Sequence, residues 1–160
     1  MEELLSLLKQ NARLSNEQLA VMLGDTPESI AKKIEEYEKK GIIKGYSVIL
    51  NDEVVSKDTV TAFIELKVTP KRDYGFDDLA RTVMMYDEVE SVALISGDYD
   101  LAVTVSGESL KNIALFVAER LSTIDGVLST ATHFVLKRYK EKGIFIEKEV
   151  VDERSFISPW

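Results

Sequence analysis

The chain has 160 residues, a net charge of −8 and a composition of 45% hydrophobic and 30% charged residues, as expected for one or two small globular domains. The absence of cysteine excludes disulfides, thiolate metal sites and thiol catalysis, and a single histidine, His133, argues against a His-rich metal site or a catalytic triad. No apolar run approaches the ~20 residues of a membrane span, and acidic residues directly follow Met1. We therefore expect a cytoplasmic chain with no membrane contact, no catalytic residues, no metal and no cofactor.

The N-terminal part of the sequence contains signals for three helices. A leucine-rich stretch near the start predicts the first. Ser15 and Gln18 then form the pattern of a capping box, and Gly24 suits the C-terminal cap of that second helix. Thr26 and Pro27 suit the N-cap and first position of a third helix. Two helices joined by a short glycine-containing turn predict a helix-turn-helix, whose second helix enters the major groove of DNA.

The third predicted helix has an apolar side and a polar side. At ~100° per residue, the apolar side comprises Ile30, Ala31, Ile34 and Tyr37. On the polar side, Ser29, Lys32 and Lys33 are the candidates for contact with base edges and phosphates of double-stranded DNA. Glutamates share this side, so an ordinary solvated helix face is the alternative interpretation. Residues 1–50 hold eight acidic and seven basic side chains, so most of the acidity lies outside this module.

After Gly41, residues 42–50 are rich in β-forming side chains and predict a strand. The string RLSNEQLA at 13–20, followed by KKGIIKGY at 39–46, is similar to sequences of the Lrp/AsnC (feast/famine) family of transcriptional regulators. The resemblance implies a winged-type helix-turn-helix of three helices joined to a C-terminal ligand-sensing domain.

The C-terminal part predicts the order β-α-β-β-α-β. The predicted strands cover 59–68, 89–96, 101–106 and 127–136, with one helix after Gly75 and another after Ser109. This order is the ferredoxin-like arrangement, in which both helices cover one face of an antiparallel sheet. Strand residues of both parities are apolar or small, so we expect the second face to be buried by dimerisation. The predicted fold class is therefore α+β.

A Gly97-Asp98-Tyr99-Asp100 turn separates the second and third predicted strands. This sequence is similar to the turn of the family's C-terminal RAM domain. The resemblance implies that Gly97, Asp98, Tyr99 and Asp100 contact an amino-acid effector near an interface between dimers. It also implies a homodimer that assembles into a tetramer or octamer. The carboxylates would accept hydrogen bonds from an α-ammonium group, and the glycine would allow close backbone approach. An ordinary hairpin turn is the alternative interpretation.

The predicted organisation is a helix-turn-helix with its exit strand at 1–50, a linker at 51–58, a RAM domain at 59–140 and an extension at 141–160. We expect a β-segment at 144–146 and expect the extension to pack on its own sheet or a neighbouring subunit. The leading hypothesis is a sequence-specific regulator, not an enzyme, modulated by a small effector. One alternative is a ligand sensor or architectural protein with weak DNA binding. A less favoured alternative is a relative of haem-pathway decarboxylases. The acidic turn would repel the carboxylates of their tetrapyrrole substrates.

Overall fold

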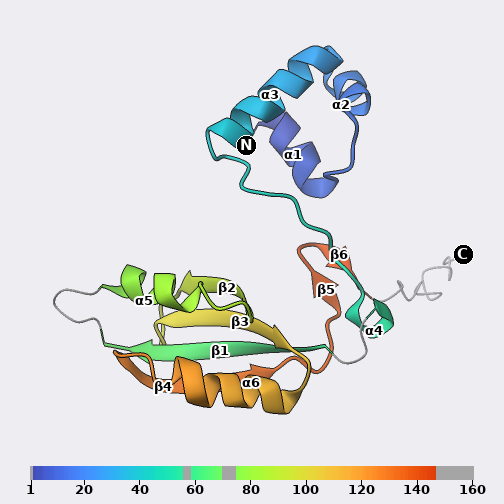
Figure 1. The fold of residues 1–160 in the computed structure, drawn as a ribbon. Helices are drawn as coiled ribbons and strands as arrows, with labels where there is room; N and C mark the ends of the chain where they lie inside the picture. The colour runs from blue at the N-terminus through green and yellow to red at the C-terminus, as the bar shows by residue number, and fades with distance from the viewer. Residues whose placement is uncertain (1, 56–58, 70–74, 147–160) are drawn as a thin grey trace, which may run out of the picture. The chain divides into compact units, whose positions relative to one another are not determined.

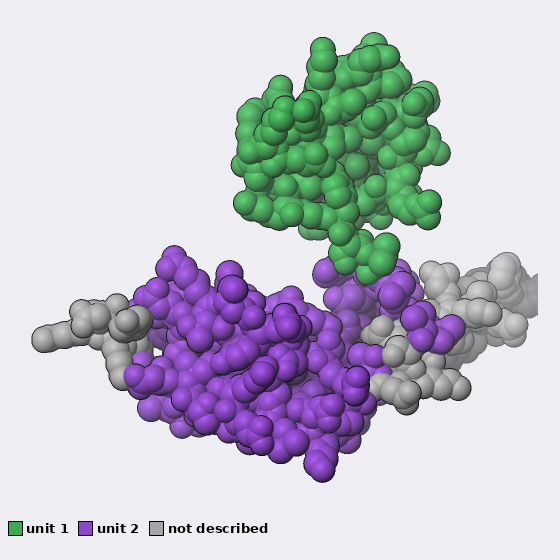
Figure 2. Space-filling view, viewed as in Figure 1, with its two compact units in different colours: residues 1–48 green, residues 49–160 purple. Residues whose placement is uncertain are grey.

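The structure is a computed structural model that describes residues 2–55, 59–69 and 75–146. The chain divides into two compact units, residues 1–48 and residues 49–160 (Figure 2). Within the described ranges, no helix is long and apolar enough to cross a membrane.

The N-terminal unit consists of three short helices, α1 (Glu3–Gln10), α2 (Asn16–Leu23) and α3 (Pro27–Lys39) (Figure 1). The predicted capping signals are confirmed. Ser15 forms a full capping box with Gln18, and Gly24 ends α2 in the left-handed conformation with φ 64°. The Thr26 side chain accepts a hydrogen bond from the backbone N–H of Ser29, so it caps α3. These local signals fix the two helix starts and the turn between α2 and α3.

The core of this unit receives side chains from all three helices, namely Leu4, Leu8, Leu19, Ala20, Ile30 and Tyr37. A hydrogen bond with the Glu2 carboxylate, together with burial, raises the pKa of Tyr37 to about 12. The polar end of this core tyrosine is thus satisfied, as a buried hydroxyl requires. The buried side of α3 leaves its opposite side free for contact with a partner.

The segment after α3 differs from the sequence prediction. Residues 44–51 have no regular secondary structure, so the exit strand predicted at 42–50 is wrong. Tyr46, Val48 and Leu50 alternate along this segment and are 54%, 72% and 51% exposed. β-forming side chains produce a strand only where a neighbouring backbone completes the ladder, and none of the described residues supplies one. The Tyr46 hydroxyl instead donates to Glu38 Oε1 at 2.8 Å, which fastens the segment to α3.

The C-terminal unit is a four-stranded antiparallel sheet with two helices on one face (Figure 1). The spatial order is β2-β3-β1-β4, and the strands are β1 (Val60–Val68), β2 (Val89–Leu94), β3 (Leu101–Gly107) and β4 (Val127–Phe134). The helices are α5 (Phe76–Val83) and α6 (Leu110–Phe116), the latter continued by a π-helical turn, η1 (Val117–Leu121), and a short helix α4 (Asp52–Val55) precedes β1. The predicted ferredoxin-like order is confirmed.

Alternation along β1 determines which face is covered. Ala62, Ile64 and Leu66 point into the core with α5 and α6 and are fully buried. The other parity forms what we call the open face, which comprises Phe63, Glu65, Lys67, Ala102, Thr104, Ala131 and His133. Phe63 is 38% exposed there, and the Glu65 carboxylate lies 3.0 Å from the His133 ring nitrogen. The open face is thus mixed in polarity rather than apolar throughout.

A small hairpin follows β4. Its strands are β5 (Lys140–Glu141) and β6 (Ile144–Phe145), so the β-segment predicted at 144–146 is confirmed over its first two residues. The turn residues Lys142 and Gly143 have φ of 45° and 91°, as in the tight primed turns that suit two-residue hairpins. The Ile146 N–H donates to the Tyr139 carbonyl at 3.0 Å, and the Asn51 amide donates to the Ile146 carbonyl at 3.4 Å. The predicted packing of residues 147–160 lies outside the described residues.

Candidate functional site

Two of the three predicted DNA-contact residues meet at one carboxylate. Asp25 lies in the turn that leads into α3, and its Oδ2 accepts from Ser29 Oγ at 2.9 Å and from Lys33 Nζ at 2.8 Å. Its Oδ1 accepts from the Thr26 backbone N–H at 2.8 Å. Sequence reasoning missed Asp25. The available signal was its spacing of four residues from Ser29 and eight from Lys33, which places all three along one side of the helix start.

This cluster keeps both of its charges. The hydrogen bond from Lys33 is the largest cause that lowers the pKa of Asp25 to about 2, followed by the bonds from the Thr26 N–H and the Ser29 hydroxyl. The same bond raises the pKa of Lys33. The Lys33 side chain is 47% exposed, so solvent screens the ion pair and a phosphate oxygen can compete with Asp25 for the ammonium.

The third predicted residue, Lys32, is exposed and has no side-chain partner among the described residues. Further along α3, Lys39 pairs with Glu35, and Lys40 pairs with Glu36 at 3.0 Å. The glutamates of this helix are therefore largely satisfied by the lysines near its C-terminal end. The other lysines of this helix, Lys32 and Lys33, lie in the first seven of its 13 residues, towards the end of a recognition helix that contacts base edges.

The Gly97–Asp100 turn connects β2 to β3. Gly97 has φ of 148°, a backbone conformation that residues with a side chain rarely adopt. The turn therefore favours glycine at this position. Asp98 is exposed and Tyr99 is partly buried. Within the described part of the chain, Asp98 has no side-chain partner, so its carboxylate is free to accept bonds from a ligand.

Asp100 has a different environment. Its Oδ2 accepts from the Val68 backbone N–H at 2.8 Å, and its Oδ1 lies 3.4 Å from Lys67 Nζ. Its own N–H donates to the Leu66 carbonyl at 3.0 Å. Asp100 therefore ties the end of β1 to the start of β3. The four predicted residues are consecutive in this turn, but the two aspartates differ in role. Asp100 holds the strands together, and Asp98 faces solvent.

In the ranges that the structure describes, no group of three histidine, aspartate or glutamate side chains could hold a metal ion. His133 pairs with Glu65 on the open face, and its side chain is 59% exposed. This histidine is therefore not packed inside its own unit.

Comparison with protein families matches each unit separately. A family described as Lrp/AsnC ligand binding domain matches residues 61–145, and one described as winged helix-turn-helix DNA-binding matches residues 2–44. The HTH-type transcriptional regulator YugG of Bacillus subtilis (strain 168) is 42% identical over 158 residues, covering 98% of this chain and 95% of that protein. The leucine-responsive regulatory protein of Escherichia coli (strain K12) is 23% identical over 145 residues, covering 91% and 88%.

Solved structures agree with these matches. A transcriptional regulator of Neisseria meningitidis, in complex with L-Met, is 26% identical with a TM-score of 0.71, covering 88% of this chain and 93% of that chain. AsnC of E. coli is also 26% identical, with a TM-score of 0.68 and the same coverage of 88% and 93%. The similarity extends over both units rather than over one isolated domain.

Proposed function

Because the chain belongs to the Lrp/AsnC family of transcriptional regulators, we propose that it binds operator DNA through the start of α3 and that an amino acid modulates this binding. The observation that carries the DNA contact is the exposed side of α3, where Ser29, Lys32 and Lys33 gather beyond the buried core positions. The chain is a DNA-binding regulator and not an enzyme, so the decarboxylase alternative is set aside. It would act in the cytoplasm.

Each residue of this face has a proposed role. Lys32 contacts a phosphate or a guanine edge directly, since lysine donors suit both acceptors. Lys33 exchanges its bond to Asp25 for one to a phosphate, and Ser29 then donates or accepts at a base edge or phosphate. Direct base contacts would supply sequence selectivity, whereas phosphate contacts would supply most of the affinity.

The proposed effector contacts are Gly97, Asp98, Tyr99 and Asp100. The free Asp98 carboxylate suits the α-ammonium group of an amino acid, and Gly97 allows the backbone to approach a ligand. Contact through Asp100 would compete with its bonds to Val68 and Lys67, so its main contribution is to hold the turn. L-Met is the first probe, because the N. meningitidis regulator was solved with it.

The proposed assembly is a homodimer through the open face, which associates further into a tetramer or octamer. Support comes from the partly exposed Phe63 and from the small side chains of Ala102 and Ala131 in adjacent strands. A near-neutral module at 1–50 also favours several modules acting on one DNA. An effector can shift such an assembly only if two states bind it with different affinity.

The test is a band-shift assay with DNA upstream of the chain's own gene, at about 50 mM and about 200 mM salt. Binding that survives competition by unrelated duplex supports the regulator. Binding to any duplex alike, or none, overturns it in favour of the sensor or architectural alternative. Repeating the assay and a light-scattering mass measurement with L-Met and the other amino acids tests the effector. If no amino acid changes affinity or mass, the effector proposal is wrong.

A further inference from the structure

The hairpin β5–β6 and the residues leading into it form a basic island. Residues 137–142 hold four basic side chains and one acidic side chain, and no other six-residue window of the sequence holds four basic ones. The rest of 51–160 holds 19 acidic and nine basic side chains. Positive charge in this part of the chain is therefore concentrated at one small structural element.

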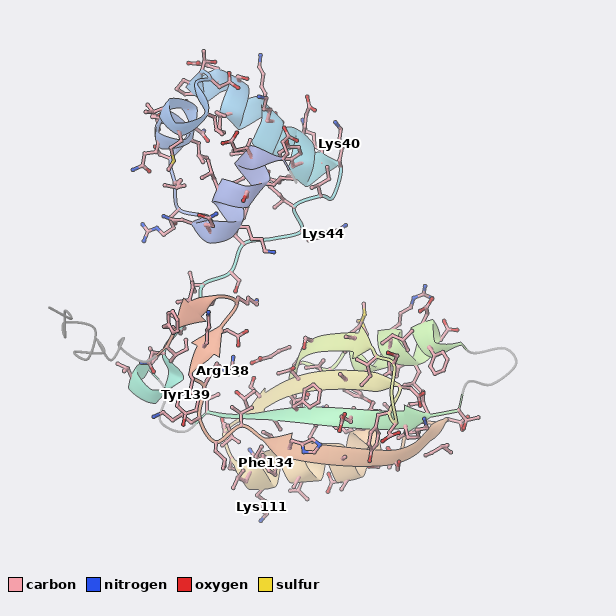
Figure 3. The ribbon with its side chains drawn as sticks, turned by 180° about the vertical axis from the view of Figure 1, so that it is seen from behind. Lys40, Lys44, Lys111, Phe134, Arg138 and Tyr139 are labelled. Atoms are coloured by element: carbon pink, nitrogen blue, oxygen red, sulfur yellow. The ribbon has the colours of Figure 1, made fainter. Side chains whose placement is uncertain are left out.

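The hairpin presents this charge on a defined backbone. The turn at Lys142 and Gly143 closes the two strands, and the Tyr139–Ile146 hydrogen bond extends the pairing by one step. Arg138 and Tyr139 lie on the segment that enters the hairpin (Figure 3). Because Asn51 also bonds the Ile146 carbonyl, the far strand is tied to the chain ahead of α4.

The lysines of the hairpin keep their charge available. Lys140 Nζ lies 4.6 Å from the centroid of the Phe145 ring, a contact that orients an ammonium without neutralising it. Lys142 is exposed at the turn. Arg138 pairs with Glu141 at 3.1 Å, but among the described residues no carboxylate pairs with Lys140 or Lys142. Their position contrasts with the carboxylate-paired lysines at the end of α3.

We propose that the hairpin is a second DNA-contacting element, in which Lys140 and Lys142 contact phosphates of duplex DNA. The inference rests on the proposed function. Charge complementarity supports it: residues 1–50, with eight acidic and seven basic side chains, have a net charge of −1, and duplex DNA binding depends on phosphate neutralisation. The ring-supported lysine and the exposed turn lysine suit a backbone contact, which adds affinity but no sequence information.

The experiment uses the full chain with Lys140→Gln plus Lys142→Gln. The matched control is Arg81→Gln plus Lys111→Gln, which removes the same charge from exposed positions on α5 and α6. Fluorescence anisotropy gives the slope of log affinity against log salt for one duplex. Each lost phosphate contact lowers this slope by about 0.9, so the hairpin variant should lose about 1.8 per bound protomer while the control keeps the wild-type slope.

A third variant, Lys140→Arg plus Lys142→Arg, retains the charges and should retain the slope. If the hairpin variant and the control behave alike while wild-type protein binds DNA, only the hairpin inference is wrong. If wild-type protein binds no DNA, the proposed function and the hairpin inference fail together. An altered oligomer mass with an unchanged slope also overturns the inference, because the hairpin would then contact a second copy of the chain.

Discussion

The Asp25 carboxylate holds the Lys33 ammonium at 2.8 Å in the turn that starts the recognition helix. An anion at this position occupies a cation that the proposed function assigns to DNA. Because Lys33 is exposed, phosphate and Asp25 compete for it on similar terms. We therefore expect the pair to limit the affinity of the free protein for arbitrary duplex.

Asp25→Asn should raise the affinity for non-specific duplex, since it removes a negative charge beside the phosphates and releases Lys33. The slope of log affinity against log salt should steepen by about 0.9 per protomer if Lys33 gains one contact. Anisotropy titrations over a salt series measure both quantities. In a Lys33→Gln background the same change should have a much smaller effect. An unchanged or weaker affinity in the single variant would contradict this role of Asp25.

Lys32→Glu plus Lys33→Glu should abolish operator binding at moderate salt, because two contacts become repulsive. The matched variant is Lys39→Glu plus Lys40→Glu, which reverses the same charge at the end of α3, where both lysines already pair with glutamates. We expect a smaller loss there. Equal losses of affinity in band-shift titrations would mean that the start of α3 has no special role.

Asp98→Asn should weaken L-Met binding by about tenfold or more without changing the melting temperature. A hydrogen bond to a charged group contributes about 1.5–3 kcal/mol, and the Asp98 side chain has no partner to lose among the described residues. Calorimetric titration measures the affinity. Asp87→Asn, an exposed aspartate in another turn, is the control. Identical affinity in both variants would remove Asp98 from the site.

Asp100→Ala should instead destabilise the C-terminal unit, since the Val68 N–H loses its acceptor. We expect a cost of about 1–3 kcal/mol and a fall of several degrees in Tm. Thermal unfolding followed by circular dichroism checks this. A Tm equal to that of wild type would show that the link between β1 and β3 is dispensable.

Gly126→Ala should destabilise the sheet by about 1–3 kcal/mol, because the residue has a left-handed backbone with φ of 97°. An added Cβ would also lie 3.2 Å from the Thr69 carbonyl oxygen, which belongs to the segment bonded to Gly126. Gly75→Ala is the control, since its φ of −76° is ordinary and its Cβ would meet open space. Urea unfolding should separate the two variants, and similar midpoints would contradict the strain argument.

The N-terminal unit should become less stable at alkaline pH, because the Tyr37 hydroxyl ionises there. Its folded pKa of about 12 exceeds the ordinary value of 10.0, so its contribution is complete below pH 10 and is lost as pH rises towards 12. Absorbance of tyrosinate measures the titration. Glu2→Gln should lower the pKa of Tyr37, because the carboxylate is the largest cause of the shift. A tyrosine titration identical to wild type would exclude that bond.

Features with local causes could be predicted from the sequence. The caps at Ser15, Gly24 and Thr26 depend on residues within one turn, and the structure has all three. The strand predicted at 42–50 failed because a ladder needs a second backbone, which local composition does not provide. The ion pair between Asp25 and Lys33 was also not predicted, because helix periodicity indicates which residues share a side but not which of them form a bond.

Helix α6 shows a subtler failure. A uniform rotation of ~100° per residue places Leu110 and Ala114 on the same side as the buried Val117 and Leu121, but Leu110 is 54% exposed and Ala114 is exposed. The buried residues include Phe116 and Val117, which are adjacent in sequence. The π-helical turn η1 widens the spacing after Phe116, so a constant rotation of ~100° per residue assigns the wrong side chains.

The segment at 44–51 has a consequence for how the chain could diversify. It forms no ladder, and residues 44–50 place no side chain in either hydrophobic core among the described residues. A protease that cuts there would release two pieces that each retain a complete core. For the same reason, recombination at this segment could exchange the N-terminal unit for another one without changing the core of the C-terminal unit.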